Sequence, residues 1–404
     1  MISRLLAPII LGLLTVSAMA DDIDAAKING AQYSAKRSAE DKVDAAIVKA
    51  EVWLDRARFS PSEIDGKLGG NARKALQAFA EDRGLKSDNP LTAEIWAALA
   101  ATGNDPAIIA YKISENDVKG PFLKKLPAKM EAMQDLKRLG YTSPREAIAE
   151  KFHMSEGLLS ALNRGKKFDR VGEPILVANL SNMPDKLAVS RIEVDKMRQT
   201  VRAFDASNKL IAFFPATVGS EEKPTPSGIL KVVSADADPN YRYNPDYKFK
   251  GVKSKKPFTI KPGPNNPVGS FWIGLSAEGY GIHGTPNPSK VSKSASHGCV
   301  RLTNWDVGLL GASVKKGDTG RFRRRRAHRK KGLNGKRPAR LGGGALLQNH
   351  FQRRRKALIL VRGRDMRCVL LDVVGGVAHR ERHAAPSEHR EIILHVADGG
   401  DLIG

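Results

Sequence analysis

The chain has 404 residues and a net charge of +24, carried by 67 Lys and Arg against 43 Asp and Glu. This length is too great for one hydrophobic core and predicts two or three domains, and two cysteines cannot make the framework of a small disulfide-stapled protein. The charge would suggest a nucleic-acid-binding protein, but residues 318–404 alone carry 21 Lys and Arg against 8 Asp and Glu, so we expect a basic C-terminal segment and no nucleic-acid partner.

Residues 1–20 have the pattern of a secretory signal peptide. Arg4 supplies the positive start, Leu5 to Val16 form an apolar run, and Ala18-Met19-Ala20 is a small-x-small cleavage site. The alternative is an uncleaved membrane anchor, for which the apolar run is short. We therefore expect an exported chain that begins at Asp21 and has no transmembrane segment.

Residues 21–103 are expected to form a small helical bundle. Apolar residues recur at helical spacing over 42–57, and the chain continues with DGKLG (65–69), ALQAF (75–79) and TAEIWAAL (92–99). This order resembles the peptidoglycan-binding helical domain. The resemblance implies a module that binds the cell wall, and a spacer bundle that binds nothing is the alternative.

Residues 104–140 are rich in lysine and predict a linker with one helix near 128–138. In residues 141–182, a capping box begins one helix at Ser143, a second helix follows from Ser155, and GEPILVANL predicts a strand. This order resembles a degenerate LysM module, which is a glycan-binding fold, although no first strand is apparent ahead of the two helices.

From Leu187 the sequence changes to short β-strands. RQTVRAFDASNKLIAFFPATVG (198–219) predicts two strands joined by a turn at 205–208, and turns that contain proline and glycine separate the segments that follow. These signals predict a mainly β domain over residues 187–317.

The hexapeptide SHGCVR near the end of this domain carries the candidate chemistry. A thiol attacks a carbonyl as the thiolate, and His297 lies two residues before Cys299, so in an extended strand both side chains point the same way. Gly298 leaves room for a substrate carbonyl, and the N–H groups of Gly298 and Cys299 are candidate oxyanion donors. Ser296 or a nearby carbonyl could orient the imidazole, and Arg301 on the same face suits a substrate carboxylate.

Together with IHGT (282–285), this hexapeptide closely resembles the signature of the L,D-transpeptidase (YkuD-type) family. TPSG (225–228) and PGPNNPVGSFWIGL (262–275) match the wider context of that signature. The resemblance covers residues 187–317. It implies a periplasmic transferase of cell-wall biogenesis. With the other segments, we expect a multidomain chain: an α-helical N-terminal bundle, a degenerate LysM-like α/β module, a mainly β catalytic domain of the L,D-transpeptidase type and a disordered C-terminal tail.

By this resemblance, Cys299 attacks the carbonyl of a diamino acid in a peptidoglycan tetrapeptide stem and releases the terminal D-alanine, and an amine then takes the acyl group from the thioester. His297 would act as general base, His283 would line the site, and Arg301 with Gly284 would bind substrate. No metal or organic cofactor is implied, because the thiol does the covalent work.

The acyl acceptor stays open at this point. Another stem would give 3-3 crosslinks, a wall-attached protein would become anchored, and water would give hydrolysis. The rival hypothesis from another class is a catalytically inactive protein that binds peptidoglycan stem peptides and glycan strands.

Residues 318–404 do not fit the family pattern. The family domain ordinarily closes with a strand reading Gly-Thr-Pro-Val-x-Phe, whereas here VKKG (314–317) is followed by DTGRFRRRR, and arginine replaces lysine as the main cation. We interpret this segment as one read in a shifted frame, with a disordered tail and a basic binding arm as alternatives. Loss of the closing strand is expected to expose a sheet edge and to lower stability.

Overall fold

The computed structural model describes residues 23–36, 42–181, 183–247, 251–316 and 319–323, which all belong to one compact unit. The predicted signal peptide (1–20) lies outside the described residues, and so does the predicted tail apart from residues 319–323.

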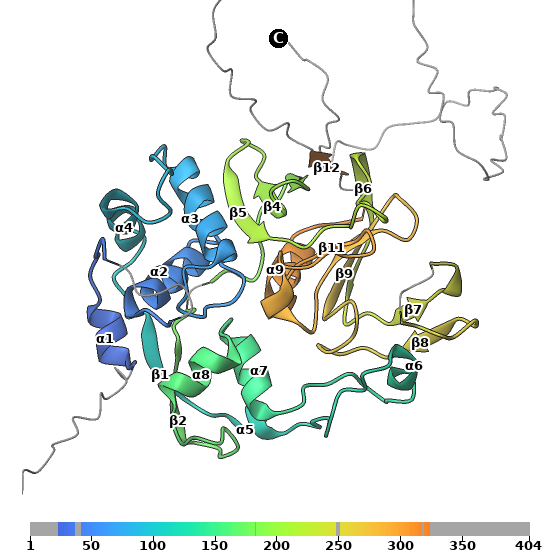
Figure 1. The fold of residues 1–404 in the computed structure, drawn as a ribbon, viewed down its shortest axis with the longest axis horizontal. Coiled ribbons are helices and arrows are strands. Elements are labelled where there is room, and N and C mark those ends of the chain that lie inside the picture. The colour runs from blue at the N-terminus through green and yellow to red at the C-terminus, as the bar shows by residue number, and fades with distance from the viewer. Residues whose placement is uncertain (1–22, 37–41, 182, 248–250, 317–318, 324–404) are drawn as a thin grey trace, which may run out of the picture. The chain divides into compact units, whose positions relative to one another are not determined.

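The N-terminal part is helical, as the sequence predicts. Apolar side chains of its helices bury one another around Phe79 and the edge-to-face pair Trp53–Trp96, whose ring centroids lie 5.0 Å apart. Thr92 caps the last helix by accepting a hydrogen bond from the backbone N–H of Ile95. The helices are α1 (Ala25–Gly30), α2 (Ala45–Arg56), α3 (Gly70–Asp82) and α4 (Ala93–Ala100) (Figure 1).

The next part is an antiparallel strand pair with helices between its strands. The pair consists of β1 (Ile108–Lys112) and β2 (Pro174–Ala178), with Ile108 opposite Ala178. The intervening helices are α5 (Glu115–Val118), α6 (Met130–Met133), α7 (Pro144–Lys151) and α8 (Glu156–Leu162).

Strand β1 corrects the prediction that residues 104–140 are a linker. A five-residue strand is too short to show a clear period in the sequence, and it becomes a strand because β2 supplies its backbone hydrogen bonds. The helix expected near 128–138 is only the four residues of α6. None of them is buried, so no packing stabilises a longer helix there.

The remaining part is a mixed eight-stranded sheet in the order β11-β10-β9-β6-β12-β3-β4-β5, with helix α9 (Asn304–Ala312) packed against it. Its strands are β3 (Arg191–Asp195), β4 (Thr200–Phe204), β5 (Leu210–Pro215), β6 (Gly228–Ala237), β9 (Phe271–Leu275), β10 (Gly281–His283), β11 (Val300–Arg301) and β12 (Thr319–Arg323). A separate hairpin pairs β7 (Tyr241–Tyr243) with β8 (Phe258–Ile260), and single 3-10 turns span Pro245–Tyr247 and Pro288–Lys290.

Strand β12 corrects the expectation that the closing strand is missing. Its backbone pairs parallel with β3 and antiparallel with β6, so it lies in the middle of the sheet and leaves no open edge there. The sheet domain therefore extends beyond residue 317. Backbone N–H and C=O groups make the hydrogen bonds between strands. A segment without the sequence expected of the closing strand can therefore still pair with β3 and β6.

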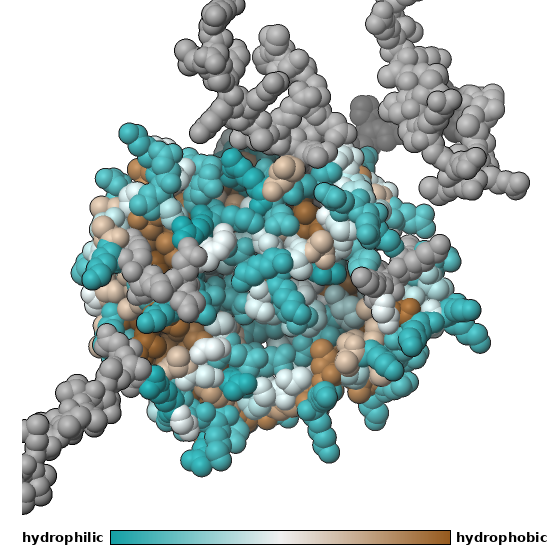
Figure 2. Space-filling view, in the orientation of Figure 1, coloured by the Kyte–Doolittle hydropathy of each residue, from teal (hydrophilic) through white to brown (hydrophobic). Residues whose placement is uncertain are grey.

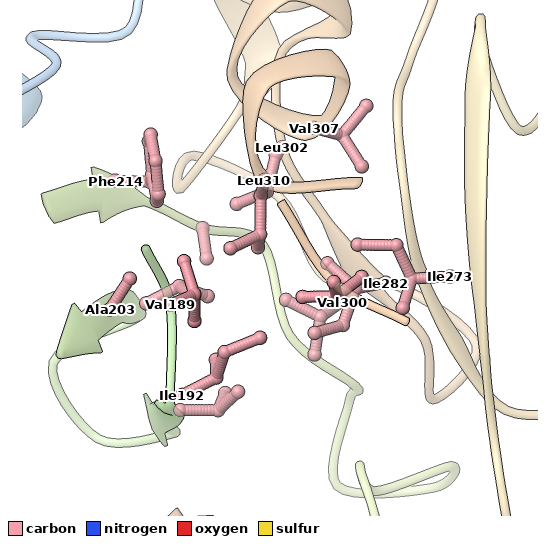
Figure 3. Close-up of a cluster of buried hydrophobic side chains, with 14 of the residues drawn as sticks. Val189, Ile192, Ala203, Phe214, Ile273, Ile282, Val300, Leu302, Val307 and Leu310 are labelled. Atoms are coloured by element: carbon pink, nitrogen blue, oxygen red, sulfur yellow. The ribbon is translucent and has the colours of Figure 1, made fainter. Parts of the chain in front are cut away.

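One face of the sheet packs against the hydrophobic core, so the strand residues between the core residues lie on the other face. Figure 3 shows Ile273, Ile282, Val300 and Leu302 gathered in one hydrophobic cluster beneath α9. Because successive strand residues alternate between faces, the neighbours of Ile282 and Val300 are directed away from this cluster.

The free edge of β5 is covered by the helical part of the chain. Phe59 forms a parallel bridge with Phe213 on β5, and the backbone N–H of Ser60 donates to the carbonyl of Phe213 over 2.9 Å. Helix α3 lies beside the same strand (Figure 1). The contact removes an edge that could otherwise pair with another chain.

A buried polar cluster joins the three parts. Nδ1 of His153, after α7, lies 2.7 Å from Oδ2 of Asp55 on α2, and its ring stacks on Trp305 of α9 at 5.0 Å. Beside them, the hydroxyl of Ser60 donates to Oδ2 of Asp306 over 3.0 Å. These contacts make the helical part, the strand pair and the sheet a packed unit rather than modules on flexible linkers.

We expect the replacement Asp306→Asn to stabilise the protein above pH 7. Burial first, and then repulsion from Asp55, raises the pKa of Asp306 to about 7. A carboxyl whose pKa is raised on folding favours the folded state at low pH, and this contribution is lost as pH rises from about 4 to about 7. Asparagine stays neutral, so the variant should gain on the order of 2–4 kcal/mol at pH 8 and little at pH 4.

Thermal unfolding of both proteins at the two pH values checks this expectation. The exposed Asp246→Asn is the matched control and should shift neither curve. Equal melting temperatures for wild type and Asp306→Asn at pH 8 would contradict it.

Hydrophilic residues cover most of the molecular face drawn in Figure 2, and hydrophobic ones form separate small areas. Within the part of the chain that the structure describes, no helix has the length and apolar character needed to cross a bilayer.

Candidate active site

His283 ends β10 and is held in one orientation. Its side chain is 4% exposed, and its ring stacks on Trp272 of β9 with centroids 5.6 Å apart. Nδ1 lies 2.6 Å from the carbonyl oxygen of Gly284, which can only accept, so Nδ1 carries the proton and Nε2 holds the lone pair. Burial first, and then the charge of Arg301, lowers the pKa of His283 to about 3, so the ring is neutral at physiological pH.

Strand pairing brings Cys299 to the strand that carries this histidine. Strands β10 and β11 run parallel with His283 opposite Arg301, and Cys299 directly precedes β11. The thiol is half-buried and free of any disulfide, with Sγ 3.7 Å from the carbonyl oxygen of Gly279. Burial raises the pKa of Cys299, while a hydrogen bond from the Gly281 backbone and the charge of Arg301 oppose that rise.

The predicted extended strand through His297 and Cys299 is wrong. Only Val300–Arg301 are in strand, and Gly298 has φ +114°, a backbone conformation that side-chain-bearing residues rarely adopt. Residues 297–299 therefore bend, and the two-residue spacing no longer places both side chains on one face. His297 is exposed, and burial together with Lys223 and Arg301 lowers its pKa.

Ser296 shapes this bend. Its buried hydroxyl donates to the carbonyl of Cys299 and accepts from the N–H of Gly298 over 3.1 Å. The Gly298 N–H is thereby engaged, so of the two predicted oxyanion donors only the Cys299 N–H is left for a substrate. Thr225 closes the bend from outside, because its hydroxyl donates to the carbonyl of Gly298 over 2.7 Å.

Arg301 is the common electrostatic neighbour of the site. It is half-buried on β11, and its charge acts on Cys299, His283 and His297. Burial lowers the pKa of Arg301, and the charges of Cys299 and Tyr241 raise it. Within the described residues no group of three His, Cys, Asp or Glu side chains is arranged to hold a metal ion.

Comparisons with known proteins identify the family of the chain. A family model for the L,D-transpeptidase catalytic domain, YkuD, matches residues 190–321. A relative from Bacillus licheniformis, named as the L,D-transpeptidase YkuD, is 30% identical over 174 residues, which are 43% of this chain and 88% of the relative. The chain belongs to the L,D-transpeptidase family.

Two further similar proteins have lower sequence identity to this chain. The Bacillus subtilis protein named as L,D-transpeptidase YkuD is 25% identical over 172 residues, covering 42% of this chain and 88% of that protein. A crystal structure of the L,D-transpeptidase (residues 123-326) from Xylanimonas cellulosilytica covers 72% of this chain and 100% of that one at 13% identity, with a TM-score of 0.32, too low to establish a shared fold by itself.

The structure of this L,D-transpeptidase domain also shows site residues without an assigned role in the sequence. Trp272 packs on His283 rather than in the core, and Tyr280 lies against Gly298. Thr225 belongs to the TPSG segment, so the motif itself marked it without revealing its hydrogen bond to the carbonyl of Gly298. Gly284, predicted to bind substrate, is buried and supplies the carbonyl that orients His283.

We expect Gly298→Ala to destabilise the L,D-transpeptidase domain by about 1–3 kcal/mol and to impair the site. At φ +114° a Cβ is strained, and it would lie 2.5 Å from Cε1 of Tyr280. Chemical unfolding measures the loss. Gly172→Ala is the matched control, because Gly172 also has positive φ, +79°, but no atom within 4 Å of a Cβ. A smaller loss at Gly298 than at Gly172 would contradict the role given to Tyr280.

Proposed function

We propose that the protein is a peptidoglycan L,D-transpeptidase in which Cys299 is the nucleophile. The observation that carries this proposal is the parallel pairing of β10 with β11: the free thiol of Cys299 directly precedes β11, and β10 ends at a buried, neutral His283 whose tautomer is fixed by Gly284. A thiol with an adjacent oriented base is the arrangement that covalent acyl transfer needs.

We assign the base role to His283 rather than to His297. The Nδ1–H bond to Gly284 leaves the Nε2 lone pair as the acceptor, which is how a catalytic imidazole is usually oriented. His297, in contrast, is exposed on the bend and lies on no strand. This assignment replaces the base role that the sequence spacing gave to His297.

The resting site holds a neutral thiol and a neutral imidazole. Burial disfavours a thiolate–imidazolium ion pair, because it raises the pKa of Cys299 and lowers the pKa of His283. The proton therefore moves from Sγ to Nε2 as the sulfur attacks, and Arg301 stabilises the negative charge that develops on the sulfur.

The acyl-transfer steps then balance as follows. The Sγ–C bond forms at the stem-peptide carbonyl, the bond from that carbon to the terminal D-alanine nitrogen breaks, and His283 returns the proton to the leaving amine. An acceptor amine next attacks the thioester, its proton passes through His283 to the departing sulfur, and Cys299 is restored. The backbone N–H of Cys299 is the donor available to the oxyanion.

The parts before the sheet support a wall-bound enzyme. The antiparallel pair of β1 and β2 encloses helices α5 to α8, and α7 and α8 are the two helices on which the resemblance to a LysM module rests. We propose that this module and the helical bundle bind glycan strands, and that the protein acts in the periplasm. A second stem, giving 3-3 crosslinks, and a wall-attached protein are the candidate acceptors.

The test is acylation of the full chain by a carbapenem, followed by mass spectrometry. One adduct on Cys299 is expected, and digestion of purified wall material incubated with the protein should show new crosslinked or protein-linked stems. Intact, folded protein without an adduct would favour the rival hypothesis, a catalytically inactive peptidoglycan-binding protein.

A further inference from the structure

A cavity lies between helix α3 and the start of β4, and Cys299 is not part of its lining. Its volume is about 360 Å³, within the range of small-ligand sites. Neither Cys299, His283 nor Arg301 lines it. The lining residues are Lys74, Gln77, Ala78, Met197, Arg198, Gln199, Thr200, Arg202 and Phe213.

The cavity has an excess of positive charge. Lys74, Arg198 and Arg202 line it, and Glu81 accepts from Arg202 over 2.8 Å and from Arg198 over 3.4 Å. A guanidinium has five N–H donors, so these two bonds leave capacity for a second carboxylate. Burial lowers the pKa of Lys74, the charge of Asp195 opposes that shift, and an anion in the cavity would oppose it further.

A buried hydroxyl in the same cavity lacks a partner. Thr200 is 2% exposed, and its Oγ1 makes no hydrogen bond within the part of the chain that the structure describes. Burying a hydroxyl without a hydrogen bond is costly, so its presence in the lining points to a ligand that bonds to it.

The remaining wall is partly apolar. Ala78 and Phe213 are buried, and Met197 is 57% exposed at the rim. Guanidinium groups beside a small apolar surface suit the C-terminus of a peptide that has methyl side chains and a free carboxylate. They suit inorganic phosphate less well, because phosphate has no apolar part.

The cavity is linked to the catalytic loop. Lys74 and Gln199, both in its lining, hydrogen-bond to the hydroxyl of Ser292, which lies between the two histidine motifs. The N–H of Ser292 donates to Oγ1 of Thr217 over 2.8 Å, and Thr217 pairs through its backbone with Arg301. A ligand held by Lys74 would therefore be connected to Arg301 through Ser292 and Thr217.

We propose that this cavity binds the C-terminal carboxylate of a second wall peptide, distinct from the one acylated at Cys299. The proposal rests on the proposed function for the identity of the peptide. Arg198, Arg202 and Lys74 bind the carboxylate, Thr200 donates its hydroxyl, and the alanine methyl groups contact Ala78, Met197 and Phe213.

Isothermal titration calorimetry of the full chain tests the site. The probes are N-acetyl-D-alanyl-D-alanine, its C-terminal amide and inorganic phosphate. The acid should bind, and the amide should bind about tenfold or more weakly because it lacks the charge. Thr200→Val and Lys74→Met should each weaken binding of the acid about tenfold or more, whereas Lys209→Met, on the turn after β4, should not.

Two measurements keep the outcomes distinct. Thr200→Val should unfold at no lower temperature than wild type, since the hydroxyl it removes has no partner, and the control Lys209→Met should react with a carbapenem at Cys299 at the wild-type rate. No binding, equal binding of acid and amide, binding of phosphate alone, or unchanged binding in both cavity variants would each overturn the site. A missing adduct on Cys299 would instead count against the proposed function.

Discussion

Replacing Cys299 by alanine is expected to reduce acyl transfer by about 10³-fold or more, because no other group in the site can form the thioester. The half-buried position tolerates the loss of one sulfur atom, so the fold should be retained. The readouts are the carbapenem adduct by mass spectrometry and the crosslinked stems released from digested wall material.

Two comparisons make the result specific to the thiol. Cys299→Ser keeps the shape but has a hydroxyl, which ionises far less readily, and it should also be inactive. Ser294→Ala, exposed in the same loop, should keep full activity. Muropeptide products that are unchanged in the alanine variant would exclude Cys299 as the nucleophile.

His283→Gln is expected to slow acylation of Cys299 by about 10²–10⁴-fold, the usual contribution of a general base. His297→Gln is the matched control on the exposed bend and should change the rate by less than about tenfold. Because both residues become glutamine, the comparison separates the role of position from the loss of an imidazole. Thermal unfolding of both variants checks that loss of the Trp272 stack has not unfolded the domain.

The pH dependence gives a second, independent test of the base. Since the pKa of His283 is about 3, its imidazole is already neutral at pH 5, and the acylation rate should not rise between pH 5 and 8 through titration of the base. With His297 as the base, the rate would fall as pH drops through a pKa below the usual histidine value. A steep loss on mutation of His297 and retained activity in His283→Gln would reverse the assignment.

The sequence by itself determined the family, the residues of the site and the main helices. The two histidine-glycine motifs carry the family signature, and Ser143 and Ser155 cap helices at the predicted places. These features could be predicted because capping and helical periodicity involve residues only three or four positions apart.

The roles that we propose within the site depend on the tertiary structure. The carbonyl of Gly284 fixes the tautomer of His283, the stack on Trp272 comes from another strand, and the engaged N–H of Gly298 removes one expected oxyanion donor. The two-residue spacing suggested His297 as the base on the assumption that residues 297–299 form an extended strand. The positive φ of Gly298 is incompatible with that assumption.

Long-range pairing decided the rest. Strand β1 forms only because β2, more than sixty residues later, completes its ladder, and β12 enters the sheet centre through backbone bonds to β3 and β6. The cavity between α3 and β4 likewise joins Lys74 to Thr200, which are far apart in the chain. A sequence pattern reports local preference, whereas these arrangements depend on which distant segments supply hydrogen-bond partners and burial.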